Sequence, residues 1–470
     1  MRSNGSMQKK DELGVLIETG PQDWQIFQRG DDDTATIELA GRWVTGEPYR
    51  KAVVAVRLAR ESDGEAVSRS LQWVRATTSR AGTWKVKLQG VPAGGLYRIE
   101  TMLQLDDGPV ERGQRGDMVH HIGVGDVWVI TGQSNAEGHG KSPVPDAPEL
   151  GVHMFRANGE WALATHPLGD STQTKYPPNR LGSNPSHSPW LVFGKTLRAE
   201  LGLPIGLIPA SLGGSPLSAW TRGVDGVLFD NMLRYVEDAG GGVRGVVWYQ
   251  GESDASVPQL KDYRRNFKRF VADLRKCFGN AQLPVITTQL NRWVGEPNVA
   301  GDAGWEGMRE LQRQLAGTMR HVVLLSTLDL GLSDVIHTNS LGNITIGQRA
   351  ASAALGAVYD RDVKFRHPDC VAARRKSAKR IELQFDHVDE RLHYESMIPD
   401  EFPFVVRDAK GDVPVAGWSI PKTDRFEIRL GRALSGTAVV IGAPTTFPPS
   451  VVPQDVSGHR PMLAFTQKVE

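Results

Sequence analysis

The stretch Gly125-Asp-Val-Trp-Val-Ile-Thr-Gly-Gln-Ser-Asn135 decides the fold of this chain. Its apolar half reads as a buried strand, and its polar half reads as a tight turn. A strand that ends this way places its last side chains at the carboxyl edge of a sheet, where open α/β sheets bind ligands. Gly132 permits the sharp turn, and a helix is expected to open behind it, with free N–H groups that favour negative charge. Ser134 is therefore a candidate nucleophile, although a helix-capping serine would give the same tetrad.

A second block supplies the other groups that a serine nucleophile needs. Asp334 stands three residues before His337, behind the apolar run 321–327. An aspartate at this spacing can accept the imidazole Nδ1–H, which leaves Nε2 free to deprotonate a serine. Taken alone, Asp-x-x-His is more often a capped turn.

A third block, Val246-Val-Trp-Tyr-Gln-Gly-Glu-Ser-Asp254, is again a strand that runs into a turn. The side-chain amide of Gln250 at its edge could donate to an oxyanion. The alternative is a loop stabilised by side-chain hydrogen bonds. Asp254 is a rival partner for His337, but a weaker one because its block lies on another strand.

In this order, the three blocks resemble the SGNH (GDSL-like) hydrolase superfamily, and in particular its sialate O-acetylesterase and acetylxylan esterase branch. The tetrad Gly132–Asn135, the Trp-x-Gln-Gly-Glu block that ends at Glu252 and the terminal Asp-x-x-His carry the resemblance, together with residues 204–215 and the pair Ala219-Trp220. It spans roughly residues 120–355. The chain departs from the branch at Leu212, usually a tryptophan, and at Ser218-Ala219, often a glutamate. Both departures bear on the substrate pocket more than on the chemistry.

The resemblance implies a three-layer αβα, flavodoxin-like catalytic domain with a mostly parallel sheet. It also implies that Ser134 is the nucleophile, His337 the general base and then acid, and Asp334 the orienting carboxylate. The implied oxyanion donors are the Ser134 N–H, the N–H of Gly213 or Gly214, and the Gln250 amide. One residue of register separates the two glycines, and we take Gly214 as the donor. Supporting roles are expected for Gln133, Asn135, Gly213 and Glu252.

The pattern of short runs divides the chain. We expect a tag or disordered start over 1–14, a β-sandwich-like module over 15–120, the catalytic domain over 121–360 and a β-rich module over 361–470 that packs beside the first module. Helices are expected at Trp190–Glu200, Asp262–Phe278, Trp305–Arg320 and Ile344–Tyr359, where apolar residues recur at helical spacing.

Composition excludes several classes of protein. The net charge of +1 gives no global field toward nucleic acid or an anionic membrane, and no segment has the roughly 18 apolar residues of a membrane span. Two cysteines rule out a disulfide framework, and we interpret Cys277 as a packed core thiol. His139 is interpreted as a solvated loop histidine. No ligand cluster such as His-Glu-x-x-His is present, so neither metal nor cofactor is expected.

The sequence thus predicts a serine O-acetylesterase that acts on an acetylated oligo- or polysaccharide, either a plant polysaccharide such as xylan or xyloglucan or an O-acetyl sialic acid. A lipolytic or thioesterase activity on the same scaffold, and an inactive carbohydrate-binding protein, are the alternatives. The resemblance suggests secretion or a periplasmic location, although the start of the chain lacks an apolar leader. The oligomeric state stays open.

Overall fold

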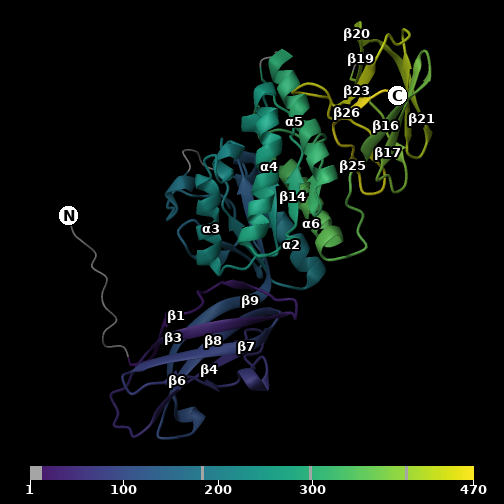
Figure 1. Ribbon diagram of the computed structural model, residues 1–470. Coiled ribbons are helices and arrows are strands. Elements are labelled where there is room, and N and C mark those ends of the chain that lie inside the picture. The colour runs from purple at the N-terminus through teal and green to yellow at the C-terminus, as the bar shows by residue number, and fades with distance from the viewer. Residues whose placement is uncertain (1–12, 181–184, 296–298, 397–400) are drawn as a thin grey trace.

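The computed structural model describes residues 13–180, 185–295, 299–396 and 401–470. Strand-rich segments at the two ends of the chain flank a central segment, residues 134–358, that holds the α-helices of the described residues (Figure 1). No helix in these ranges has the length and apolar character that a bilayer crossing needs. The expected tag over 1–14 falls mostly outside the described residues, and Gly14 already begins the first strand.

The first segment forms strands around an apolar core of its own. The strands are β1 (Gly14–Thr19), β2 (Ile26–Gln28), β3 (Thr34–Val44), β4 (Ala52–Arg60), β5 (Val74–Arg75), β6 (Thr77–Thr78), β7 (Thr83–Pro92) and β8 (Gly94–Leu105), with short 3-10 turns at Arg69–Leu71 and Val110–Arg112. One sheet has the order β1-β3-β7-β6, and β4, β5 and β8 join a second sheet through the following strand. Alternate side chains such as Ile37 and Leu39 fill the core between them, as period-2 patterning predicts.

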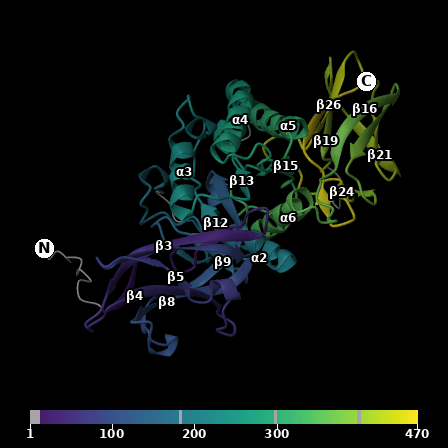
Figure 2. The ribbon, with the colours of Figure 1, turned by 60° about the horizontal axis from the view of Figure 1, so that its bottom comes forward.

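The long strand β9 (Gln114–Gly132) connects this segment to the catalytic sheet. Its first half pairs antiparallel with β8, and its second half pairs in parallel with strands on both sides. Figure 2 shows it passing from the N-terminal strands toward the centre of the molecule. The boundary that we expected between residues 120 and 121 therefore falls inside one continuous strand.

The central sheet has the order β11-β10-β12-β9-β13-β14-β15. Its strands are β10 (Val152–Phe155), β11 (Trp161–Leu163), β12 (Ile205–Pro209), β13 (Gly245–Tyr249), β14 (Val285–Thr288) and β15 (Val322–Leu325). All neighbouring pairs from β10 to β15 are parallel, whereas β11 pairs antiparallel. Near-continuous apolar strands such as Val127–Ile130 are typical of a sheet that is covered on both faces.

The helices beside this sheet pack in pairs: α2 contacts α6, and α4 contacts α5. Their bounds are α1 (Ser134–Glu137), α2 (Trp190–Leu201), α3 (Val227–Ala239), α4 (Val257–Cys277), α5 (Val299–Thr318) and α6 (Ser340–Val358), with 3-10 turns at Pro177–Asn179, Leu217–Trp220 and Glu252–Asp254. Each expected helix is present, but α4 and α5 begin five and six residues earlier than predicted. Helix α3 was not predicted, although its Leu228, Met232 and Val236 recur at helical spacing and are buried.

One prediction about a cysteine was wrong. Cys277 is exposed, with its Sγ 3.1 Å from the guanidinium of Arg222. The buried stripe of α4 ends at Leu274, so the last turn of the helix extends beyond the core. The other cysteine, Cys370, is buried and free.

The last segment packs against the catalytic part of the chain and not beside the N-terminal strands as predicted (Figure 1). Its strands are β16 (Asp369–Ser377), β17 (Arg380–Asp386), β18 (Leu392–His393), β19 (Phe404–Asp408), β20 (Gly411–Val413), β21 (Val415–Lys422), β22 (Arg425–Leu430), β23 (Ala438–Gly442), β24 (Gln454–Asp455), β25 (Arg460–Pro461) and β26 (Phe465–Lys468). Gln289, just after β14, bonds the backbone of Ala464 in both directions, and buried Arg309 of α5 donates to the Thr445 carbonyl. Satisfying these buried polar groups fixes the contact.

Candidate active site

The fold places Ser134 directly after β9, at the start of α1. Gly132 has a φ of 129°, and a Cβ there would lie 2.1 Å from the carbonyl oxygen of Tyr249, so only glycine fits this turn. His337 lies in the loop between β15 and α6, which begins at the same edge of the sheet. Parallel strands thus bring together two residues that are 203 positions apart.

The side chains of Ser134, His337 and Asp334 form one hydrogen-bonded chain. Nε2 of His337 lies 2.8 Å from Ser134 Oγ, and its Nδ1 lies 2.9 Å from Asp334 Oδ2. Oδ1 of Asp334 accepts the backbone N–H groups of Ile336 and His337, which fixes the carboxylate. The arrangement sets the imidazole with Nδ1 protonated and Nε2 facing the hydroxyl, the geometry of a general base. Asp254, the rival partner, instead accepts from the Leu217 amide and from Gln250.

Electrostatics keep this imidazole neutral. Burial is the largest influence and lowers the pKa of His337; nearby His139 and Lys141 lower it further, and the bond to Asp334 only partly opposes them. Burial would raise the pKa of Asp334, but hydrogen bonds from Lys141 and His337 outweigh it and hold that pKa well below its ordinary value. Across the neutral range the pair is therefore carboxylate and neutral imidazole.

Of the expected oxyanion donors, two backbone amides remain available. The Gly213 N–H donates to Glu137 Oε1 at 2.7 Å and is therefore already bonded. Gly214 has a φ of 68°, and neither its N–H nor that of Ser134 has an acceptor within the described part of the chain.

The side-chain amide of Gln250, which we expected to donate to an oxyanion, has two acceptors among the described residues. Its Nε2 donates to the Ser215 carbonyl at 3.2 Å and to Asp254 Oδ2 at 2.5 Å, so both amide hydrogens are engaged away from Ser134. The side chain is fully buried. This geometry corresponds to the alternative reading of the block, a turn stabilised by side-chain hydrogen bonds, and Gln250 shapes the turn that follows Gly214.

The expected supporting residues connect the three catalytic loops. Asn135 donates to Glu252 Oε1 at 2.7 Å and to the Ile336 carbonyl at 3.3 Å, and it accepts the Thr338 N–H at 3.1 Å. Oε1 of Gln133 accepts the N–H of Ser253 at 3.2 Å. Burial, with a smaller contribution from the charge of Asp254, raises the pKa of Glu252 to about 7, and its Oε2 lacks a hydrogen-bond partner among the described residues. These contacts hold the serine and histidine loops in register.

Sequence reasoning missed a segment beside the triad. His139, expected to be a solvated loop residue, is only 8% exposed, and its ring stacks on that of His337 with centroids 4.6 Å apart. Lys141 Nζ lies 2.8 Å from Asp334 Oδ2. No local pattern could indicate these contacts, because their partners lie about 200 residues away in the chain.

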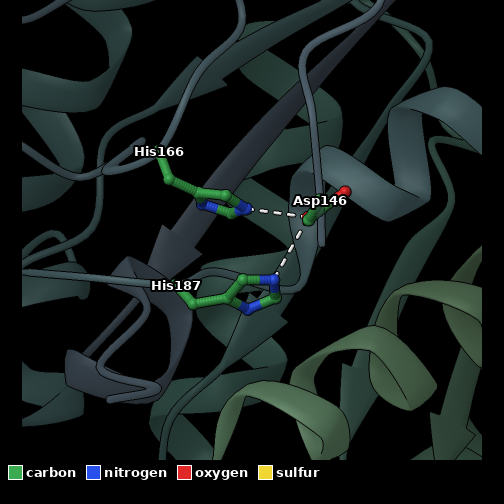
Figure 3. Close-up of side chains that lie close together, drawn as sticks. All are labelled: Asp146, His166 and His187. Carbon is green, nitrogen blue, oxygen red and sulfur yellow. Dashed lines mark hydrogen bonds and ion pairs between the residues drawn. The ribbon is translucent and has the colours of Figure 1, made fainter. Parts of the chain in front are cut away.

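A cluster of potential metal ligands was also missed. Asp146, His166 and His187 converge, with both imidazole Nε2 atoms near one carboxylate oxygen, at 2.8 and 3.1 Å (Figure 3). The other oxygen accepts from Lys195 at 2.5 Å. The Ser188 amide donates to Nδ1 of His166, so the proton of that ring is on Nε2. An ammonium group and two imidazole nitrogens thus contact the two oxygens of this carboxylate, whereas Nδ1 of His187 has no hydrogen-bond partner among the described residues.

Comparison with known proteins agrees with this geometry. Residues 124–356 match the family "Carbohydrate esterase, sialic acid-specific acetylesterase". A probable carbohydrate esterase of Arabidopsis thaliana is 26% identical over 49% of this chain and 90% of its own length. The human sialate O-acetylesterase is also 26% identical, over 50% of this chain and 49% of its own length. The chain thus spans about half the length of that relative.

A solved structure extends the likeness to nearly the whole chain. The carbohydrate acetylesterase from Xanthomonas citri has a TM-score of 0.66 at 23% identity and covers 96% of this chain and 99% of its own. At this identity the likeness defines the fold, which is SGNH-like with additional β-rich modules. The protein is a carboxylic ester hydrolase. Its central segment, residues 124–356, is similar to the sialic acid-specific acetylesterase family of carbohydrate esterases.

Proposed function

We propose that this protein is a serine O-acetylesterase that removes acetyl groups from carbohydrate by a Ser134–His337–Asp334 mechanism. The observation that carries the proposal is the unbroken hydrogen-bond chain from the Ser134 hydroxyl through both ring nitrogens of His337 to Asp334. Acyl transfer by a serine nucleophile needs a base bonded to the hydroxyl and a carboxylate bonded to that base, and this chain of hydrogen bonds supplies both.

The proposed reaction has two halves. Ser134 Oγ attacks the acetyl carbonyl while Nε2 of His337 takes its proton, and the backbone N–H groups of Ser134 and Gly214 stabilise the oxyanion. The imidazolium then protonates the departing sugar oxygen, which leaves acetyl-Ser134. Water, deprotonated by His337, releases acetate and restores the serine.

We also propose how the chain is divided into domains and how the catalytic domain is layered. A three-layer αβα domain over 121–360 presents the site, and the modules over 15–120 and 361–470 buttress it. Strand β9 joins the first module to this domain, and the contact of Gln289 with Ala464 supports the placement of the last module. The substrate is an acetylated plant polysaccharide or an O-acetyl sialic acid, and a secreted or periplasmic location would suit either.

Acetate release tests the function directly. Purified protein is incubated with acetylated xylan, acetylated xyloglucan, acetylated pectin and O-acetyl sialic acid, with Ser134→Ala as the matched control. We expect the wild type to release acetate from at least one of these substrates and the variant to release none. Preference for octanoyl over acetyl esters would favour the lipolytic alternative. Absence of release from every substrate would favour the carbohydrate-binding one.

A further inference from the structure

The segment after the nucleophile helix, residues 138–141, runs along the loop that carries Asp334 and His337. The Lys141 amide donates to Ser333 Oγ at 2.9 Å, and the Gly140 amide donates to the His187 carbonyl at 3.1 Å. A Cβ at Gly140 would lie 2.9 Å from the Ser340 backbone, so the two segments touch. The backbone contacts on both sides of Lys141 and His139 thus place their side chains against the proton-transfer pair.

Lys141 shares an oxygen with the catalytic base. Its Nζ lies 2.8 Å from Asp334 Oδ2, the same atom that accepts from Nδ1 of His337. A positive charge at this distance offsets part of the negative charge that would otherwise stabilise an imidazolium. The Lys141 side chain is 61% exposed, so solvent screens the effect without removing it.

His139 acts on the same ring from its face. The two imidazoles are nearly parallel, with an interplanar angle of 23°, and the outer ring is bonded through Nε2 to Glu137 Oε2 at 3.2 Å. This stack covers one side of His337 and contributes to its burial.

The charged groups that face His337 come from three elements. Asp334 lies on its own loop, Lys141 and His139 lie on the segment after α1, and Glu252 reaches the loop backbone only through Asn135. Glu137 lies behind His139. Only Asp334 favours the imidazolium by direct contact, and Lys141 offsets part of the negative charge of Asp334.

We propose that Lys141 is a positioning residue that acts through Asp334 to lower the proton affinity of His337, so that the base stays neutral in mildly acidic solution. The inference rests on the proposed function, because it assigns His337 as the base. Its chemistry requires no further reactant: the ammonium changes only the charge that the imidazole sees.

The test is the pH profile of kcat/KM for Lys141→Met, with Lys141→Arg as the charge-conserving variant. Lys87→Met is the matched control, because Lys87 forms an equally short, exposed pair with Glu38 in the N-terminal segment. We expect the acid limb of Lys141→Met to move up by about half a pH unit. The ratio of its kcat/KM to that of wild type then falls as the pH drops below 8, toward a limit of about threefold at pH values below both midpoints. Lys141→Arg and Lys87→Met should follow the wild-type profile.

A titration of His337 by NMR gives a readout that does not depend on turnover. Its midpoint should rise in Lys141→Met by the same half unit, and the difference should shrink in about 1 M salt, where the Debye length is about 3 Å. Superimposable titrations, or a loss of rate that is equal at every pH, would overturn the role of Lys141. Normal turnover by Ser134→Ala would instead overturn the triad, so the two failures are distinguishable.

Discussion

The carboxylate of Glu137 accepts the backbone N–H of Gly213 at 2.7 Å, although the two residues are 76 positions apart. Glu137 ends the helix that Ser134 begins, and Gly213 precedes the glycine that we propose as an oxyanion donor. One partly buried hydrogen bond thus ties the nucleophile helix to the proposed oxyanion turn. A charge-assisted bond of this kind is strong enough to fix the turn before substrate binds.

Replacement of the nucleophile is the first prediction. Ser134→Ala should abolish acetate release while leaving the fold intact, because the side chain is small and lies at the edge of the sheet. The loss is expected to be about 10⁴- to 10⁶-fold in rate. Circular dichroism and thermal unfolding check the fold, and a serine-directed phosphonate should label wild type but not the variant. A well-folded variant with normal turnover would exclude Ser134.

Gln250→Ala separates two roles for this amide. Because Nε2 bonds the buried carboxylate of Asp254, its removal leaves that group short of a donor. We expect a loss of about 1–3 kcal/mol in the free energy of unfolding. A direct oxyanion donor would show the opposite pattern, a fall in kcat of about 10²- to 10³-fold at unchanged stability. Denaturant melts and steady-state kinetics on the same samples distinguish the two.

Glu252 should make stability depend on pH. Burial raises its pKa in the folded protein to about 7, above the unfolded value near 4.3. The folded state therefore holds the proton more tightly, and the contribution of this group is complete below about pH 4 and is lost as the pH rises to about 7. Glu252→Gln can still accept from Asn135 and should flatten this part of the curve. The melting temperature measured between pH 4 and 8 checks it; equal slopes in both proteins would contradict the assignment.

Activity should persist into mildly acidic solution. The pKa of His337 is lowered, chiefly by burial, so the neutral base is present down to below the ordinary value of about 6.5. The acid limb of kcat/KM, which reports the free enzyme, should have its midpoint below that value. A midpoint above about 7 would mean that Asp334 outweighs burial at this site.

Chelation should change neither activity nor stability. The cluster of Asp146, His166 and His187 is the one group of three potential ligands among the described residues, and Lys195 already bonds its carboxylate. Prolonged dialysis against a chelator should therefore leave acetate release and the melting temperature unchanged. A loss restored by added Zn²⁺ would show that a cation, and not hydrogen bonding, holds this cluster.

The sequence alone determined the parts of this protein whose physics is local. An apolar run that ends in Gly132 predicts a strand and a turn, and three residues of spacing let Asp334 reach the ring of His337. The period of apolar residues gave α2, α4, α5 and α6, because each such pattern buries one face whatever lies opposite. Composition also set simple bounds: two cysteines form at most one internal disulfide, and a net charge of +1 gives no global field toward nucleic acid.

Only the tertiary structure decided which distant groups meet. Lys141 reaches Asp334 across 193 residues, Gln250 turns toward Asp254, and the last strands pack against α5 and not against the first module. These contacts depend on which faces the packed sheet leaves exposed and on which donors already have acceptors. Neither the exposed faces nor the unpaired donors can be identified from neighbouring residues in the chain, because both are set by burial that exists only once the whole sheet has formed.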